Sequence, residues 1–182
     1  PGWGDGNENL LSLFIEKYKG TLILDADALN LISENPQLLK SRTRTLITPH
    51  LGEMSRLINK EVRWIKKNKV EAVQIFINQY PDISVLLKDS VSLFYHDRNF
   101  YYLPLGSSAL ARGGSGDLLA GLIGGFAGYL SLKEAVFTAN YLNGKTAEIL
   151  SRNKDEIHLS ILDIPKNYSL VWKDKDNRFD IE

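Results

Sequence analysis

Five consecutive positions, Gly113-Gly114-Ser115-Gly116-Asp117, have the clearest capacity for chemistry, and a run of small and apolar residues follows them. Glycine accepts positive φ, so successive backbone N–H groups can point inward and hold an anion. The N-terminus of a helix predicted over 116–129 adds partial positive charge at the same place. Asp117 lies in its first turn, where a carboxylate can take a proton from a substrate hydroxyl while the N–H groups stabilise a transferred phosphoryl group.

A purely structural interpretation of the same positions is that the glycines make a tight turn and Asp117 caps the helix. The composition of the helix argues against this, because an interior glycine costs up to ~1 kcal/mol relative to alanine. The small residues in question are Ala120, Gly121, Gly124, Gly125, Ala127 and Gly128. Such a helix is useful where another backbone or a ligand must approach very closely.

Apolar patterning indicates the elements that must position this turn. Short continuous apolar runs at 21–25, 45–48 and 83–88 predict strands buried on both faces. Runs at 91–95 and 99–103, joined by a polar turn, predict a hairpin. Helices are predicted over 8–19, 26–40 with an interruption at Asn35-Pro36, 51–59, 61–79, 116–129 and 132–150, the last with a Ser131–Glu134 capping box.

The alternation of strands and helices predicts an α/β fold with a mostly parallel central sheet, to which the hairpin adds an antiparallel part. Ligands of such sheets bind beyond the carboxyl ends of the strands. Polar clusters follow all three predicted strand ends: Asp25-Ala26-Asp27, Thr48-Pro49-His50 and Lys88-Asp89-Ser90. We therefore expect these clusters to share a cleft.

Length and composition narrow the class of protein. The chain has 182 residues, which suits one domain over 1–172 and a polar tail over 173–182. Lys plus Arg and Asp plus Glu both number 22, so no net basic field favours nucleic acid. The lack of cysteine excludes disulfides and thiolate metal sites and suits the cytoplasm. No apolar run is long enough for a membrane span.

Segment 110–121 resembles the signature of the ribokinase-like superfamily and, more closely, that of its NAD(P)H-hydrate dehydratase branch (the C-terminal domain of YjeF-type proteins). Three further segments match that branch: Asp25-Ala26-Asp27-Ala28-Leu29-Asn30, Thr48-Pro49-His50-Leu51-Gly52-Glu53-Met54 and Pro1-Gly2-Trp3-Gly4. The resemblance covers about residues 1–165 and implies a three-layer α/β/α sandwich. Family members carry further residues before the opening loop, so we expect this chain to lack an N-terminal part.

The resemblance implies a hydro-lyase that repairs hydrated NADH and NADPH. ADP or ATP, with Mg²⁺, phosphorylates the ring hydroxyl, and phosphate loss restores the double bond. Phosphate is a far better leaving group than hydroxide, so a kinase-like site can serve a dehydratase. The family also implies a homo-oligomer, expected to be a tetramer, and an NAD(P)H-hydrate epimerase domain upstream.

Residue roles follow from the same resemblance. Asp117 is implied as base and substrate ligand, with the anion hole made by Gly114, Ser115 and Gly116. The hydrated dinucleotide contacts His50 and one of Gly2 or Gly4. The nucleotide contacts Gly116 and the segment Lys88, Asp89, Ser90, Val91 and Ser92.

Several of these residues also have plain structural interpretations. Glu53 either holds Mg²⁺ or is an acid favoured at a helix start. Asp27 either caps the next helix or joins Asp25 in a metal–nucleotide site. Lys88 is otherwise a solvated strand end, and His50 an ordinary loop residue.

Two positions depart from the family pattern. Asp89 stands where the family usually has glycine, and a carboxylate there would repel nucleotide phosphates. Asn143-Gly144 stands where His-Gly is frequent. The alternative functions are a kinase for a sugar, hydroxymethylpyrimidine or pyridoxal, and a catalytically silent nucleotide-binding or assembly module.

Overall fold

The computed structural model describes residues 8–39, 44–104, 110, 112–153 and 160–173. The chain divides into two compact units, Pro1–Leu103 and Pro104–Glu182. Gly2 and Gly4, both predicted to contact substrate, lie outside the described residues, as does the polar tail from residue 174 onward.

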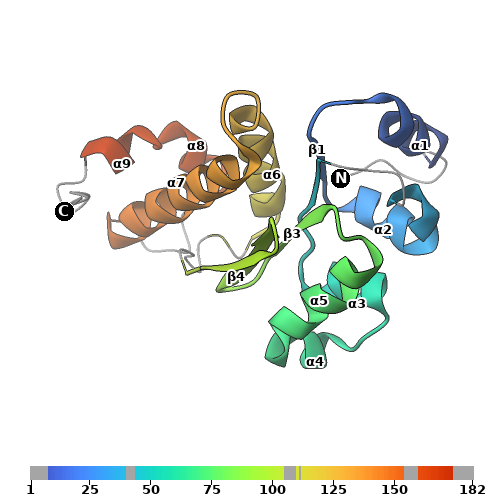
Figure 1. Cartoon of the computed structure of the whole chain (residues 1–182). Helices are drawn as coiled ribbons and strands as arrows, with labels where there is room; N and C mark the ends of the chain where they lie inside the picture. Colours follow the sequence, from blue (N-terminus) through green and yellow to red (C-terminus); the bar gives the residue numbers. More distant parts are fainter. Residues whose placement is uncertain (1–7, 40–43, 105–109, 111, 154–159, 174–182) are drawn as a thin grey trace. The chain divides into compact units, whose positions relative to one another are not determined.

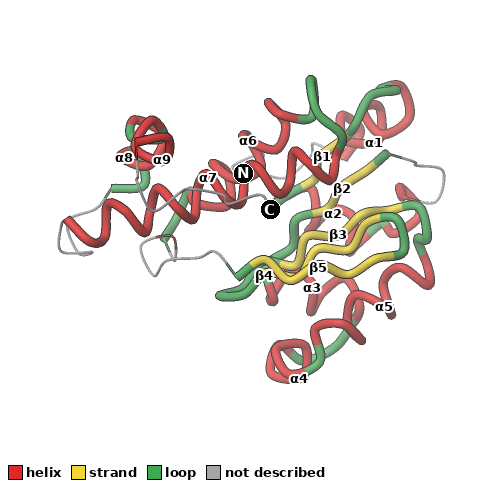
Figure 2. The backbone as a smooth tube through the Cα atoms, turned by 60° about the vertical axis from the view of Figure 1, so that its left-hand side comes forward, coloured by secondary structure: helices red, strands yellow, loops and turns green. Residues whose placement is uncertain are grey.

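The first unit contains a five-stranded sheet in the order β1-β2-β3-β4-β5 (Figure 2). Its strands are β1 (Leu22–Leu24), β2 (Thr45–Ile47), β3 (Ile83–Leu87), β4 (Ser92–His96) and β5 (Asn99–Leu103). The first three strands are parallel, and the β4–β5 hairpin adds two antiparallel pairings. The predicted α/β architecture and its antiparallel hairpin are confirmed.

The helices of this unit follow the predicted pattern closely. They are α1 (Glu8–Lys17), α2 (Asp27–Glu34), the 3₁₀ helix η1 (Pro36–Leu39), α3 (Leu51–Ile58), α4 (Val62–Lys67) and α5 (Lys69–Gln79). The helical patterning predicted near 61–79 is confirmed, but it forms two helices, because Asn68 has non-helical φ and ψ of −130° and 48°. Its side-chain amide donates to the carbonyl of Trp64 at 2.9 Å, and such competition for backbone groups is how asparagine ends a helix.

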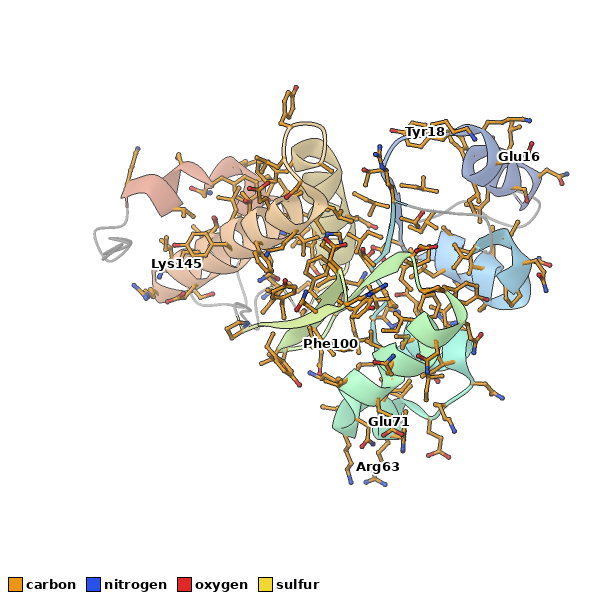
Figure 3. The ribbon with its side chains drawn as sticks, viewed as in Figure 1. Glu16, Tyr18, Arg63, Glu71, Phe100 and Lys145 are labelled. Carbon is orange, nitrogen blue, oxygen red and sulfur yellow. The ribbon has the colours of Figure 1, made fainter. Side chains whose placement is uncertain are left out.

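Alternate strand residues face a core shared with the helices. Ile47 and Val85 pack in one cluster with Met54 of α3 and Phe76 of α5, all four of them fully or almost fully buried. Burying such side chains contributes roughly 1.5–3 kcal/mol each. The opposite surface of α4 and α5 is charged, and Figure 3 shows Arg63 and Glu71 pointing away from the rest of this unit.

The second unit is helical: α6 (Ser115–Phe126), α7 (Leu132–Asn153), α8 (Asp163–Lys166) and α9 (Ser169–Lys173) (Figure 1). The predicted capping box is confirmed, since Ser131 N–H donates to Glu134 at 3.0 Å and Glu134 N–H donates to the Ser131 hydroxyl at 3.3 Å. Helices α8 and α9 were not predicted, because elements of four and five residues are too short to display a helical period. Over the described ranges, no helix combines the length and apolar character that a membrane crossing needs.

Candidate functional site

The glycine-rich turn opens α6 as the sequence predicts. Gly114 is the N-cap residue and has a left-handed backbone, with φ 86° and ψ −10°, which glycine adopts without a Cβ penalty. Its carbonyl accepts the N–H of Leu118 at 3.0 Å, and the Ser115 N–H donates to the Arg112 carbonyl at 3.3 Å. Within the described chain, the N–H groups of Gly116 and Asp117 have no backbone acceptor. Two adjacent donors therefore remain available for an anion at this helix N-terminus.

Asp117 borders a largely apolar hollow in the second unit. Asp117 lies in the first turn of α6 and is exposed. The hollow has a volume of about 480 Å³, and its walls include Gly121, Gly125, Phe126 and Tyr168. Among the residues that the structure describes, no hydrogen bond or ion pair engages this carboxylate, so the capping interpretation has no bond to support it. The role of Asp117 as base remains a prediction, now with a cavity beside it.

The glycines of α6 leave one face of the helix open. A Cβ placed on Gly121 or Gly125 would meet nothing within 4 Å. Both residues line the hollow, so their missing side chains are what make room for it. This observation agrees with the expectation that a ligand or another backbone approaches α6 closely.

Tyr168 lines the same hollow and was not singled out by the sequence. Its hydroxyl donates to Oδ1 of Asn143, whose side chain is 3% exposed, and burial raises the pKa of Tyr168 to about 12. The phenol is therefore neutral and a hydrogen-bond donor over the whole physiological range. Asn143 stands where the family frequently has the histidine of a His-Gly pair. Its side chain thus accepts a hydrogen bond from a residue 25 positions further along the chain. Local sequence patterns do not predict a contact between residues so far apart in the chain.

In the first unit, the polar clusters after the parallel strands contact one another, and the cleft that we expect them to share remains a prediction. Lys88 forms a parallel bridge with His50, and its N–H donates to the Pro49 carbonyl at 2.8 Å. Its Nζ lies 2.6 Å from Oδ1 of Asp25. The two side chains of this ion pair are only 18% and 10% exposed, so the alternative of Lys88 as a solvated strand end is wrong.

The backbone beside Asp25 is unusual. Ala26 has φ 50° and ψ −121°, a conformation that L-residues rarely adopt and that costs of order 1–3 kcal/mol. Its carbonyl accepts the N–H groups of Leu29 and Asn30 at 2.9 and 3.2 Å. Asp27 then begins α2, but the N-cap position belongs to Ala26. Strain of this kind clusters at functional sites, which agrees with a ligand-binding role for the aspartate motif.

His50 and Glu53 form a reciprocal capping box at the start of α3. Nδ1 of His50 accepts the N–H groups of Gly52 and Glu53 at 2.9 and 3.1 Å, while the His50 N–H donates to Glu53 Oε2 at 2.7 Å. Because Nδ1 is an acceptor, the neutral ring carries its proton on Nε2. Nε2 lies 3.4 Å from Glu53 Oε1, and the imidazole is 56% exposed. The ring is therefore fixed in one tautomer and still accessible to a ligand.

The structure gives Glu53 the helix-start role. Its side chain is 6% exposed, and both carboxylate oxygens face His50. In the described part of the chain, no group of three or more histidine, aspartate or glutamate side chains could hold a metal ion. Mg²⁺ coordination by Glu53 remains a prediction.

Replacing Glu53 distinguishes its two roles. We expect Glu53→Ala to lower the free energy of unfolding by about 1 kcal/mol, because the His50 N–H loses its acceptor, whereas Glu53→Gln keeps an acceptor oxygen and most of the stability. Urea unfolding of the two variants measures this difference. An unchanged stability with a raised Mg²⁺ requirement for turnover would instead establish a metal role.

Asp89, expected to repel nucleotide phosphates, has a partner. Its Oδ2 lies 2.6 Å from Nζ of Lys69, and the two side chains are 15% and 16% exposed. Burial alone would raise the pKa of Asp89, but the Lys69 ammonium and the backbone N–H of Ser90 outweigh burial and lower it. The carboxylate is therefore ionised and neutralised by a neighbouring cation.

Comparison with solved structures first defines the class of fold. A ribokinase-like superfamily protein from Enterococcus faecalis matches with a TM-score of 0.80 at 22% identity, over 94% of this chain and 60% of its own. The fold is ribokinase-like, as predicted from the sequence.

The chain belongs to the NAD(P)H-hydrate dehydratase family, whose model matches residues 1–166. A bifunctional NAD(P)H-hydrate repair enzyme from Dictyoglomus turgidum is 34% identical over 91% of this chain and 33% of its own length. The ADP/ATP-dependent NAD(P)H-hydrate dehydratase from Bacillus subtilis, co-crystallised with ATP/Mg²⁺, matches with a TM-score of 0.70 at 30% identity, over 83% of this chain and 55% of its own. The chain thus spans about a third to a half of these relatives.

Proposed function

We propose that the protein carrying this chain dehydrates hydrated NADH or NADPH with ADP or ATP as phosphoryl donor. The observation that carries the proposal is the start of α6, where two available N–H groups lie beside Asp117, a residue that lines a hollow of about 480 Å³. Membership of the NAD(P)H-hydrate dehydratase family supports this chemistry over other phosphoryl transfers. A single catalytic domain over residues 1–172 is part of the proposal.

In this proposal each group has a defined task. Asp117 takes the proton of the ring hydroxyl as that oxygen attacks the terminal phosphorus of the nucleotide, whose bridging P–O bond breaks and releases AMP from ADP or ADP from ATP. The anion hole expected from Gly114, Ser115 and Gly116 stabilises the transferred phosphoryl group, with the Gly116 N–H available and the Ser115 N–H shared with the Arg112 carbonyl. The phosphate then leaves with the C–O bonding pair, and loss of a ring proton completes the double bond. His50, whose imidazole is 56% exposed, and Gly2 or Gly4 bind the hydrated dinucleotide, and residues 88–92 bind the nucleotide.

Mg²⁺ fits this arrangement through the nucleotide. The ion needs few protein carboxylates, because phosphate oxygens and waters complete its coordination. The described residues offer no cage of acidic side chains, which agrees with such a site. When bound, Mg²⁺ would neutralise phosphate charge; Glu53 and Asp27 are the acids proposed to lie near it.

The test is direct. Hydrated NADH or NADPH is supplied to the purified gene product with ADP or ATP and Mg²⁺, and absorbance of the reduced nicotinamide is followed. We expect absorbance to grow only when hydrate and nucleotide are both present. Stable phosphorylation of a sugar, hydroxymethylpyrimidine or pyridoxal without this signal would favour the kinase alternative, and nucleotide binding without turnover would favour the silent module.

Three further properties belong to the proposal. We expect a cytoplasmic homo-oligomer, a tetramer by resemblance, and an NAD(P)H-hydrate epimerase domain on the same polypeptide. The bifunctional repair enzyme of Dictyoglomus turgidum supports the last of these. Light scattering of the gene product measures the oligomeric state, and an epimerase assay on the same sample tests the second activity.

A further inference from the structure

Lys69 connects α5 to the loop between β3 and β4. It is the first residue of α5, and its Nζ lies 2.6 Å from Oδ2 of Asp89. The same Nζ donates to the carbonyl of Val91 at 2.8 Å. One ammonium group therefore binds two positions of the loop, on either side of Ser90.

The loop is also braced internally. The Ser92 hydroxyl donates to the Asp89 carbonyl at 3.2 Å and accepts the Asp89 N–H at 3.4 Å. Lys88, at the start of the loop, is held by Asp25 and by the Pro49 carbonyl. Ser90 and Val91 remain exposed at its tip. The segment that we propose to contact the nucleotide is thus held by side chains at its base, and only Ser90 and Val91 at its tip are exposed to solvent.

We propose that Lys69 is a positioning residue for the nucleotide segment, which neutralises Asp89 and so permits a carboxylate where ADP or ATP phosphates approach. This inference rests on the proposed function only in taking residues 88–92 as the nucleotide contact. An unpaired carboxylate in a partly buried loop repels phosphate strongly, because the effective dielectric constant there is well below that of water. With Lys69 in place, the pair has no net charge and the loop keeps its shape.

The inference is tested on the dissociation constant of MgADP, measured by calorimetry on the whole gene product. We expect Lys69→Met to weaken MgADP binding by about 10-fold, with a smaller loss at high salt because salt ions partly screen the repulsion between Asp89 and the nucleotide phosphates. In the double variant, which carries both Lys69→Met and Asp89→Asn, the dissociation constant of MgADP is expected to return to within about threefold of that of the unmodified protein. The reason is that the uncompensated charge of Asp89 is then gone.

Two more variants separate charge from folding. Asp89→Asn alone is expected to bind MgADP at least as tightly as the unmodified protein, because the charge of Lys69 is then no longer neutralised by a carboxylate. Lys67→Met removes an exposed lysine from the neighbouring helix α4 and is expected to change nothing. If the unmodified protein catalyses the dehydration, Lys69→Met is expected to raise the KM for ADP and to leave kcat within about twofold of the unmodified value.

The results distinguish this inference from the proposed function. Weakened binding in Lys69→Met that Asp89→Asn does not restore would overturn the neutralising role, and so would unchanged binding in Lys69→Met or absence of MgADP binding altogether. If all the variants bind MgADP as expected but the unmodified protein dehydrates no hydrate, the proposed function is wrong and the role of Lys69 is still supported. If the unmodified protein dehydrates the hydrate but Lys69→Met binds MgADP as tightly as the unmodified protein does, the proposed function is supported and the role of Lys69 is wrong.

Discussion

Asp117→Asn is expected to lower kcat for hydrate dehydration by about 10²–10⁴-fold and to leave MgADP binding within a few fold. Asparagine has nearly the same shape, so the N–H groups at the start of α6 and the hollow beside them stay in place. What is lost is the group that accepts the proton of the attacking hydroxyl. The rate of NADH formation at saturating hydrate and ADP measures the effect.

The matched control for this experiment is Glu134→Gln. Glu134 is likewise an acid in the first turn of a helix of the second unit, and it is exposed. It differs in being engaged with Ser131 in a capping box, and neither Ser131 nor Glu134 is among the residues that line the hollow. We expect its turnover to equal that of the unmodified protein. A kcat for Asp117→Asn within a few fold of this control would show that another group is the base.

The elements of the fold were largely predictable because the signals were local. The continuous apolar runs at 21–25, 45–48 and 83–88 contain β1, β2 and β3, and the polar turn near Asp97 joins β4 to β5. The break at Asn68 was missed because apolar spacing continues across it. At Asn68 the side-chain amide also bonds the Trp64 carbonyl, and apolar periodicity does not register a bond of this kind.

The candidate site was predictable in its residues but not in its pairings. The strand-end clusters were expected to meet, and Lys88 does contact Asp25 and Pro49. The pairing itself joins positions 63 residues apart, which no spacing rule connects. The same holds for Lys69 and Asp89: the sequence displays a carboxylate that departs from the family, and only the fold supplies its partner. Glu53 shows the opposite case, since a helix-start acid three residues after His50 is a local pattern.

The ion pair between Lys88 and Asp25 leads to the largest expected effect on stability. We expect Lys88→Met to lower the free energy of unfolding by about 3 kcal/mol, because Asp25 would then be a largely buried carboxylate with no compensating charge. Adding Asp25→Asn should recover most of this loss, since removing both charges is far less costly than removing one. Urea unfolding followed by tryptophan fluorescence measures both variants.

Lys17→Met provides the comparison, because Lys17 also pairs with a carboxylate at 2.6 Å. That partner, Glu16, lies on the outer surface of α1 (Figure 3). The side chains of Glu16 and Lys17 are 68% and 67% exposed. Water screens such a pair, so no measurable change is expected. The same distance in two environments thus isolates the effect of burial. If Lys88→Met proves as stable as Lys17→Met, the ion pair between Lys88 and Asp25 does not hold the aspartate motif against β3. If the double variant Lys88→Met/Asp25→Asn is no more stable than Lys88→Met, the loss of stability comes from packing of the lysine stem and not from charge.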